Sequence, residues 1–215
     1  MKYPKIQSLY KRDPATKFRT FLPEQFALPE FETLYEVPWL WKEKLDGTNI
    51  RIDAYYTGNF LVDGVTLNVI IRGRTDKADL HKDLVAWIRD RVTAETLRPI
   101  LKGGSMTIFA EGVGPGIQKG GGNYGAEKHI KLFDIFDGRW WLQEEIEEVG
   151  HALSLDVAPV LWRAMPKEVE EVVAHGITSK FGDFQAEGVV GVPEGGLLRF
   201  NGDRIITKIK TKDYA

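Results

Sequence analysis

The sequence predicts an α+β fold, in which helices flank twisted antiparallel β-sheets. Two observations lead to this fold class: β-branched or alternating runs recur along the chain, and turns that contain Gly or Asn join several of them. Strands that are joined by tight turns run in opposite directions, so antiparallel pairing is expected. A third observation is that few segments have helical spacing, and those helices would cover the sheets from outside. We therefore expect one domain over residues 1–215.

The expected strands lie at residues 48–56, 66–72, 105–111, 129–136, 187–192 and 204–210. Turns are expected at residues 57–59 and 137–139, which contain Gly58 and Gly138. An apolar strand that contains Trp39 and Trp41 is expected before residue 44.

Three segments have helical patterns. The strongest covers residues 77–92, with Asp76 as the candidate N-cap and one apolar face made of Leu80, Leu84, Trp87, Ile88 and Val92. Weaker patterns cover residues 144–154 and 166–175. Pro166 would open the last of these helices and Gly176 would close it.

Composition excludes several classes of protein. Hydrophobic residues make up 43% of the chain and charged residues 28%, which is typical of a folded globular protein rather than a disordered one. With no cysteine, the chain has neither disulfides nor a thiolate zinc site nor a cysteine nucleophile. The four histidines form no close ligand pair, so we expect no zinc or catalytic role for them. No apolar run is long enough for a signal peptide or a membrane span, which predicts a cytoplasmic protein with no membrane partner.

Charge is distributed unevenly along the chain. Residues 1–20 carry six Lys or Arg against one Asp, and residues 199–215 carry five against two acidic residues. Residues 144–171 carry eight acidic residues against two basic ones. Solvated helices and tails are one explanation. The other is that both ends of the chain lie beside a polyanion while the acidic helices face away from it.

A lysine stands between the tryptophan-rich strand and a glycine turn, in the run Glu43-Lys44-Leu45-Asp46-Gly47. A free lysine has a pKa of about 10.4, so a nucleophilic lysine has to be desolvated or placed beside other cations. Lys208 and Lys210 alternate on one face of the last strand and could supply such a field, as could a divalent metal. The Asp46 carboxylate would act in the opposite direction, because a nearby negative charge favours the protonated lysine. Alone, the Lys-x-Asp-Gly pattern also fits an exposed strand-to-turn pair.

Further motifs follow that lysine in a fixed order: Arg72-Gly73-Arg74-Thr75, Phe109-Ala110-Glu111-Gly112, Lys131-Leu132-Phe133-Asp134-Ile135, Glu187-Gly188-Val189-Val190 and Lys208-Ile209-Lys210. With these motifs the chain resembles the covalent nucleotidyltransferase superfamily, which contains ATP-dependent DNA ligases, RNA ligases and capping enzymes. Each motif alone has an ordinary explanation, such as a core phenylalanine or a strand-end carboxylate. The joint occurrence of the motifs in the order of the family has no such ordinary explanation.

The resemblance implies a ligase-type nucleotidyltransferase (adenylation) domain that uses ATP and Mg²⁺ or Mn²⁺. Lys44 matches the nucleophile that becomes bonded to AMP, and Lys208 and Lys210 match the pair that grips the α-phosphate. Glu187 matches the glutamate that organises the metal, with Asp46 as a second metal candidate.

The resemblance also implies a nucleotide pocket. Arg74, rather than Arg72, would contact ribose or phosphate; Glu111 would hold the ribose hydroxyls, and Phe133 would stack on adenine. Further nucleotide contacts are expected from Glu43 and Asn49.

Within the superfamily, two features resemble the phage RNA ligase 2 group: Asn49, and the glycine-rich run of residues 112–119 followed by residues 123–125. The implied function is an RNA ligase that joins 5′-phosphate and 3′-hydroxyl ends through lysyl-AMP and a 5′-adenylylated strand. Its partners would be RNA or DNA strand ends. Typical relatives continue into an OB or helical domain, which we do not expect here, so an accessory protein could replace it. A minimal DNA ligase and an inactive nucleic-acid-end binding module remain as alternatives, and a capping transferase fits less well.

Overall fold

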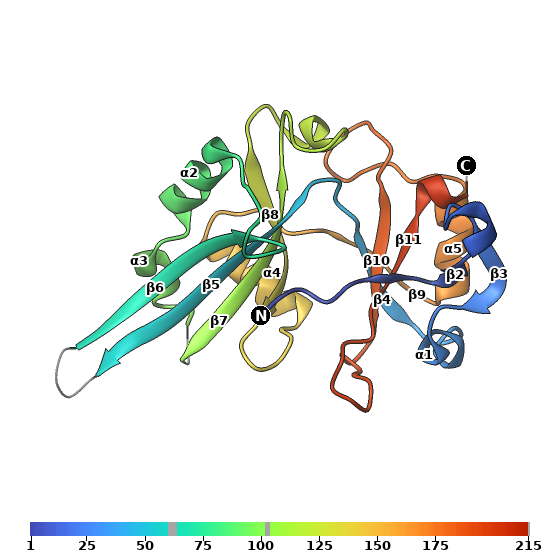
Figure 1. Cartoon of the computed structure of the whole chain (residues 1–215), viewed down its shortest axis with the longest axis horizontal. Helices are drawn as coiled ribbons and strands as arrows, with labels where there is room; N and C mark the ends of the chain where they lie inside the picture. Colours follow the sequence, from blue (N-terminus) through green and yellow to red (C-terminus); the bar gives the residue numbers. More distant parts are fainter. Residues whose placement is uncertain (60–63, 102–103, 215) are drawn as a thin grey trace. The chain divides into compact units, whose positions relative to one another are not determined.

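A four-stranded antiparallel sheet, in the order β6-β5-β7-β8, organises the middle of the chain. The computed structural model describes residues 1–59, 64–101 and 104–214. They form two units, one made of Met1–Tyr3 with Asp46–Val157 and the other of Pro4–Leu45 with the residues from Ala158 onward. The sheet belongs to the first unit, and its strands are β5 (Thr48–Asn59), β6 (Gly64–Gly73), β7 (Ser105–Val113) and β8 (His129–Phe136) (Figure 1).

One face of this sheet carries the core of the first unit. Alternate residues such as Ile50, Ile52 and Ile108 are fully buried there, as the period of two along a strand requires. The helices α2 (Lys82–Arg91), α3 (Ala94–Leu97) and α4 (Gln143–Ala152) supply the residues that pack against them.

The second unit contains a five-stranded sheet in the order β1-β11-β10-β4-β9. Its strands are β1 (Gln7–Ser8), β4 (Trp39–Glu43), β9 (Val160–Ala164), β10 (Gly188–Pro193) and β11 (Thr207–Lys210). The pairing of β1 with β11 is parallel, and the other pairs are antiparallel.

An aromatic core lies on one face of the five-stranded sheet. Trp39 and Trp41 are fully buried and stack at a centroid distance of 5.8 Å. The helix α5 (Pro166–Ala174) packs Val169 and Val173 into this core, and α1 (Pro29–Thr33) adds Phe31.

The remaining elements are short. The strands β2 (Tyr10–Arg12) and β3 (Phe21–Phe26) form a two-stranded sheet of their own, and the 3₁₀ turn η1 (Pro14–Thr16) lies between them. Two further 3₁₀ turns are η2 (Gly121–Tyr124) and η3 (Thr211–Asp213).

The fold class predicted from the sequence is confirmed, and all six strands that were expected by residue range are present. The helix expected over residues 77–92 begins only at Lys82, and Asp76 is not its N-cap. The carboxylate of Asp76 instead forms an ion pair with Arg51 on β5. Strand β11 begins at Thr207 rather than at residue 204. Within the described residues, we find no helix with the length and apolar character that a membrane span requires.

Candidate nucleotidyltransferase site

Three neighbouring strands of the five-stranded sheet bring Lys44, Glu187 and Lys210 together. Lys44 follows the end of β4, Glu187 precedes the start of β10, and Lys210 is the last residue of β11. The backbone N–H of Lys44 donates to the carbonyl of Gly188 over 2.9 Å, and Gly188 is also the register partner of Lys210. Lys44, Gly188 and Lys210 therefore form one row across the sheet.

The Glu187 carboxylate bridges the two lysines. Its Oε2 lies 2.6 Å from the Nζ of Lys44, and its Oε1 accepts a hydrogen bond from the Nζ of Lys210. Burial alone would raise the pKa of Glu187, but the positive charges of Lys44 and Lys210 outweigh burial and lower it below its usual value. Glu187 is therefore an ionised carboxylate that bonds to two lysine side chains.

Gly188 is the position that allows this close arrangement. Its φ is +147°, in a region that favours glycine, and a Cβ there would lie 2.1 Å from the carbonyl oxygen of Ile209 on the next strand. Any side chain would push β10 and β11 apart and separate Glu187 from Lys210.

Lys208 adds a third cation on the face of β11 that also carries Lys210. Burial, together with the charges of Lys210 and Lys44, lowers the pKa of Lys208 to about 8, while Glu187 acts in the opposite direction. Its register partner is Val190, whose partner on β4 is Lys42, so Lys42 lies in the same cross-strand row. Lys42 was not singled out from the sequence, although its position two residues before Lys44 on an alternating strand was a signal for it.

Glu43 points to the opposite side of β4 and is only 2% exposed. Its carboxylate accepts hydrogen bonds from the Ser179 hydroxyl at 2.5 Å and from the Lys180 backbone N–H at 2.8 Å. These bonds fix the end of β4 just before Lys44. The nucleotide contact predicted for Glu43 stays a prediction.

In the first unit, Asn49 and Glu111 are direct register partners on β5 and β7, and Glu111 is in turn paired with Lys131 on β8. Side chains of register partners share a face, so these three side chains are neighbours on the sheet face opposite the apolar core. Lys131 is almost fully buried, and its Nζ lies 2.5 Å from Asp156.

Phe133 lies within an aromatic cluster of the first unit. Its ring meets Tyr3 edge-on at 5.0 Å and is stacked with Phe109 at 6.5 Å. The Tyr3 hydroxyl donates to Asp134 over 2.5 Å, which ties the N-terminus to β8. Phe133 is partly exposed, as a base-stacking ring has to be.

Of the two arginines in the Arg72–Thr75 motif, Arg72 is engaged by Asp53 at 2.6 Å. Arg74 is exposed and has no hydrogen-bond or ion-pair partner in the part of the chain that the structure describes. The geometry therefore favours Arg74 as the residue that remains available for a ligand.

Asp46 anchors the glycine-rich loop that follows β7. Its Oδ2 accepts the backbone N–H of Gly120 at 3.1 Å, and its own N–H donates to the Tyr124 hydroxyl at 3.1 Å. Next to it, a Cβ on Gly47 would lie 2.2 Å from the carbonyl oxygen of Gly112, so this turn also requires glycine. Asp46 and Glu187 belong to different units, and their joint role as metal ligands stays a prediction.

The residues present fit a hard divalent cation. Mg²⁺ binds through one or two carboxylates and keeps several waters, and the ionised Glu187 is such a ligand. The described residues contain no group of three or more His, Asp or Glu side chains that could enclose a metal by themselves.

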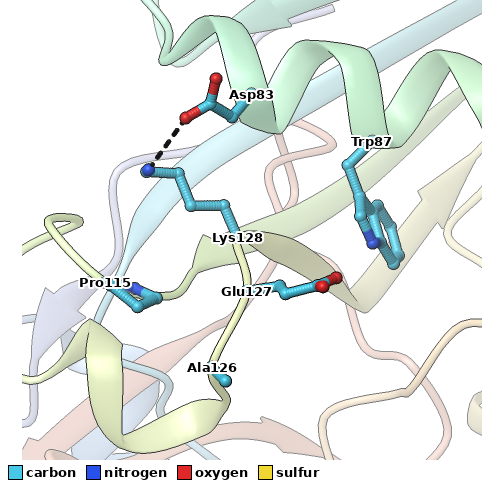
Figure 2. A pocket seen from close by; sticks show the side chains of 6 residues that line it. All are labelled: Asp83, Trp87, Pro115, Ala126, Glu127 and Lys128. Carbon is cyan, nitrogen blue, oxygen red and sulfur yellow. Dashed lines mark hydrogen bonds and ion pairs between the residues drawn. The ribbon is translucent and has the colours of Figure 1, made fainter.

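A pocket of about 310 Å³ lies elsewhere in the first unit, between α2 and residues 126–128 (Figure 2). Its charged residues include Lys128 and Asp83, which pair with each other at 3.2 Å. None of the residues predicted to bind nucleotide or metal lines it.

Comparison with known proteins identifies a family and a fold. The family model described as RNA ligase matches residues 37–210. A search of curated proteins found no match. Solved structures of a Naegleria gruberi RNA ligase share the fold: the form with PPi has 16% identity and a TM-score of 0.62, covering 99% of this chain and 58% of that one. A variant with AMP and Mn has 14% identity and a TM-score of 0.62 over 99% and 58% of the two chains. The chain thus spans less than two thirds of these solved relatives.

Proposed function

Because the chain belongs to the RNA ligase family, we propose that it is an ATP-dependent RNA ligase that joins 5′-phosphate and 3′-hydroxyl ends. The observation that carries this proposal is the row formed by Lys44, Gly188 and Lys210, with the Glu187 carboxylate bonded to both lysines. An ordinary surface lysine is not expected to share a partly buried carboxylate with a second lysine.

In the first step, the Lys44 amine loses its proton to solvent and attacks the α-phosphorus of ATP. A nitrogen–phosphorus bond forms, the bond to the β-phosphate oxygen breaks, and pyrophosphate leaves. Lys208 and Lys210 face the same side of β11 and neutralise charge that develops on the phosphate oxygens. A divalent cation held by Glu187 would supply additional positive charge to the phosphates.

The next two steps transfer the nucleotide and seal the strand. An oxygen of an RNA 5′-phosphate attacks the phosphorus of lysyl-AMP, the nitrogen–phosphorus bond breaks, and Lys44 is restored. A 3′-hydroxyl oxygen then attacks the 5′-phosphate, AMP leaves, and the hydroxyl proton is released. The chain contributes mainly positioning and positive charge in all three steps.

We propose that the nucleotide is bound by the residues on the polar face of the four-stranded sheet. The adjacency of Asn49 and Glu111 supports a joint contact with the ribose, and the partly exposed ring of Phe133 supports stacking on adenine. Arg74 is available for ribose or phosphate because no carboxylate in the described residues engages it. On this proposal both units act as one adenylation domain.

The test is covalent labelling with ATP and Mg²⁺. We expect a protein heavier by one AMP, with label transferred from the α-phosphate. The Lys44→Ala variant should take up no label, whereas Lys82→Ala, which removes an exposed lysine on α2, should be labelled like the parent. Label from the γ-phosphate, or label that persists in Lys44→Ala, would overturn the mechanism.

The strand preference is tested by sealing of matched nicks that carry ribose or deoxyribose at the 3′ end. Preferred sealing of the ribose nick supports the RNA ligase, and equal or better sealing of the deoxyribose nick would replace it by a DNA-joining enzyme. RNA binding without any AMP labelling would show an inactive end-binding module.

A further inference from the structure

A basic groove of about 940 Å³ lies within the second unit, beside β11. It is lined by residues of the N-terminal segment 5–27 and by residues 208–213. The two basic ends of the sequence therefore meet in one place. We call it the N-terminal groove.

The N-terminal groove has an excess of unpaired positive charge. Among the described residues that line it, the one acidic side chain, Asp213, forms an ion pair with Arg12, and Lys210 is bonded to Glu187. Five other cations of the groove have no carboxylate within ion-pair distance among the described residues: Lys5, Lys11, Arg19, Lys208 and Lys212. Like charges gathered in this way repel one another, and a polyanion would remove that repulsion.

An aromatic ring is held at the same groove. Phe18 lines it and is 63% exposed. Both Lys17 and Phe18 have left-handed backbone conformations, with φ of 56° and 62°. Such conformations are strained in a residue other than glycine.

Local hydrogen bonds maintain this strained turn. The N–H of Phe18 donates to the carbonyl of Asp13 at 2.9 Å, and the N–H of Lys17 donates to the carbonyl of Pro14 at 3.0 Å. The Asp13 side chain also accepts the N–H of Ala15 at 2.8 Å. The turn therefore holds the backbone in a strained conformation. The apolar ring of Phe18 remains mostly exposed to solvent in this conformation.

We propose that the N-terminal groove binds a single-stranded segment of the RNA substrate, with a base stacked on Phe18 and the phosphates along the unpaired cations. Aromatic rings between cationic side chains are the usual means of holding single-stranded nucleic acid, because any unpaired base can stack while the cations follow the backbone. An intact duplex keeps its bases stacked within the helix and offers none to such a ring.

The N-terminal groove lies next to the residues of the proposed reaction. Lys208 and Lys210 line it, and Lys210 shares the Glu187 carboxylate with Lys44. A strand that occupies the groove would therefore have its end beside the reacting lysine. This inference rests on the proposed ligase function, but its binding step is measured separately.

The experiment measures the binding of a 5′-phosphorylated single-stranded RNA 12-mer by fluorescence anisotropy. We expect Phe18→Ala to raise the Kd by about tenfold, in line with the loss of one stacked base. Phe18→Trp should bind like the parent, and Phe18→Leu should bind like the alanine variant because leucine is apolar but not planar. The matched control is Phe200→Ala, which removes a fully exposed phenylalanine outside the groove.

The cations are tested through the salt dependence of binding. Removing two phosphate contacts in the double variant Lys5→Ala/Lys11→Ala should reduce the slope of log Kd against log salt by ~1.4. The double variant Lys82→Ala/Arg89→Ala removes two exposed charges from α2 and should leave the slope unchanged.

Two results would overturn the groove: equal RNA affinity of the Phe18→Ala and Phe200→Ala variants, or an affinity for blunt duplex RNA that matches the affinity for the single strand. Absence of AMP labelling in the parent protein would instead refute the ligase function. Since RNA binding is measured without ATP, the two failures are distinguished.

Discussion

Replacement of Gly188 by alanine tests the arrangement of the catalytic strands most directly. Gly188 lies between Lys44 and Lys210 in the cross-strand row, and its carbonyl accepts the N–H of Lys44. The added Cβ would lie 2.1 Å from the carbonyl oxygen of Ile209, well inside van der Waals contact. Relief would require β10 to move away from β11, because the obstructing atom belongs to the backbone.

The magnitude follows from two separate costs. A φ of +147° strains an alanine, and forcing an extra methyl group against a packed strand adds an overpacking cost, so the free energy of unfolding should fall by about 2 to 6 kcal/mol in total. AMP labelling should also slow at temperatures where the variant remains folded, since Glu187 and Lys210 no longer meet.

Gly195 provides the matched control for the Gly188→Ala variant. Its φ is +81°, but a Cβ there would meet no described atom within 4 Å. Gly195→Ala should therefore show only the backbone cost of about 1 to 2 kcal/mol. Urea denaturation of the two variants measures the difference. Equal losses of stability would refute the close approach of Gly188 to Ile209.

Three further predictions concern other parts of the site. RNA affinity should fall as the pH is raised from 7 to 9, because the pKa of Lys208 is lowered to about 8 and the residue loses its proton in this range. Binding titrations of the Lys208→Arg variant should lack the part of this fall that Lys208 causes. In Glu43→Gln, the amide oxygen can accept from the Lys180 N–H and the amide NH₂ can donate to the Ser179 hydroxyl, so both contacts remain but lose the charge of the carboxylate; urea denaturation should show a loss of about 1 to 2 kcal/mol. Gly47→Ala should lower the Tm, because its Cβ would lie 2.2 Å from the Gly112 carbonyl oxygen.

The low pKa of Lys208 also affects folding, with a definite sign. Between pH 8 and 10.5 the unfolded lysine binds a proton more readily than the folded one, so the contribution of this residue to stability rises with pH across that window. The penalty is fully present below pH 8, where both states are protonated. Such a cost to the folded state is what a group retained for anion binding would show.

The sequence predicted the long strands well because their alternation is carried by many residues. Strand β8 has the predicted bounds of 129–136, and β5 and β7 extend only a few residues beyond theirs. The strands β1, β2 and β9 were missed because two to five residues contain too little alternation to detect. The parallel pairing of β1 with β11 depends on contacts about 200 residues apart in the sequence.

The start of helix α2 was predicted incorrectly, for a different physical reason. An aspartate before an apolar periodic segment is a common N-cap, and Asp76 fits that pattern. In the structure its carboxylate is used by Arg51, a residue on another strand whose partner cannot be inferred from local pattern. The predicted apolar face is confirmed in part: Leu84, Ile88 and Val92 are buried and Trp87 is partly buried, whereas Leu80 lies before the helix begins.

For the site, the order of the motifs indicated which residues to examine but not how they contact one another. The resemblance assigned Glu187 to the metal, and nothing in the sequence indicated that it would bond to both Lys44 and Lys210. Similarly, the basic composition of the two ends suggested a polyanion, but only the fold shows that the ends share a groove and that Phe18 lies in it.

The Lys44–Glu187 ion pair has a consequence for the proposed mechanism. An ammonium group bonded to a carboxylate has no free lone pair, so the geometry in the free protein is that of a resting state. A divalent cation that bound Glu187 would compete with Lys44 for this carboxylate and would release the lysine side chain from the ion pair. Glu187 would then control when the lysine becomes a nucleophile. On this reasoning Glu187→Gln should not behave as a simple loss of metal affinity: excess Mn²⁺ should fail to restore the parent rate of AMP labelling, because the carboxylate that bonds to Lys44 is gone.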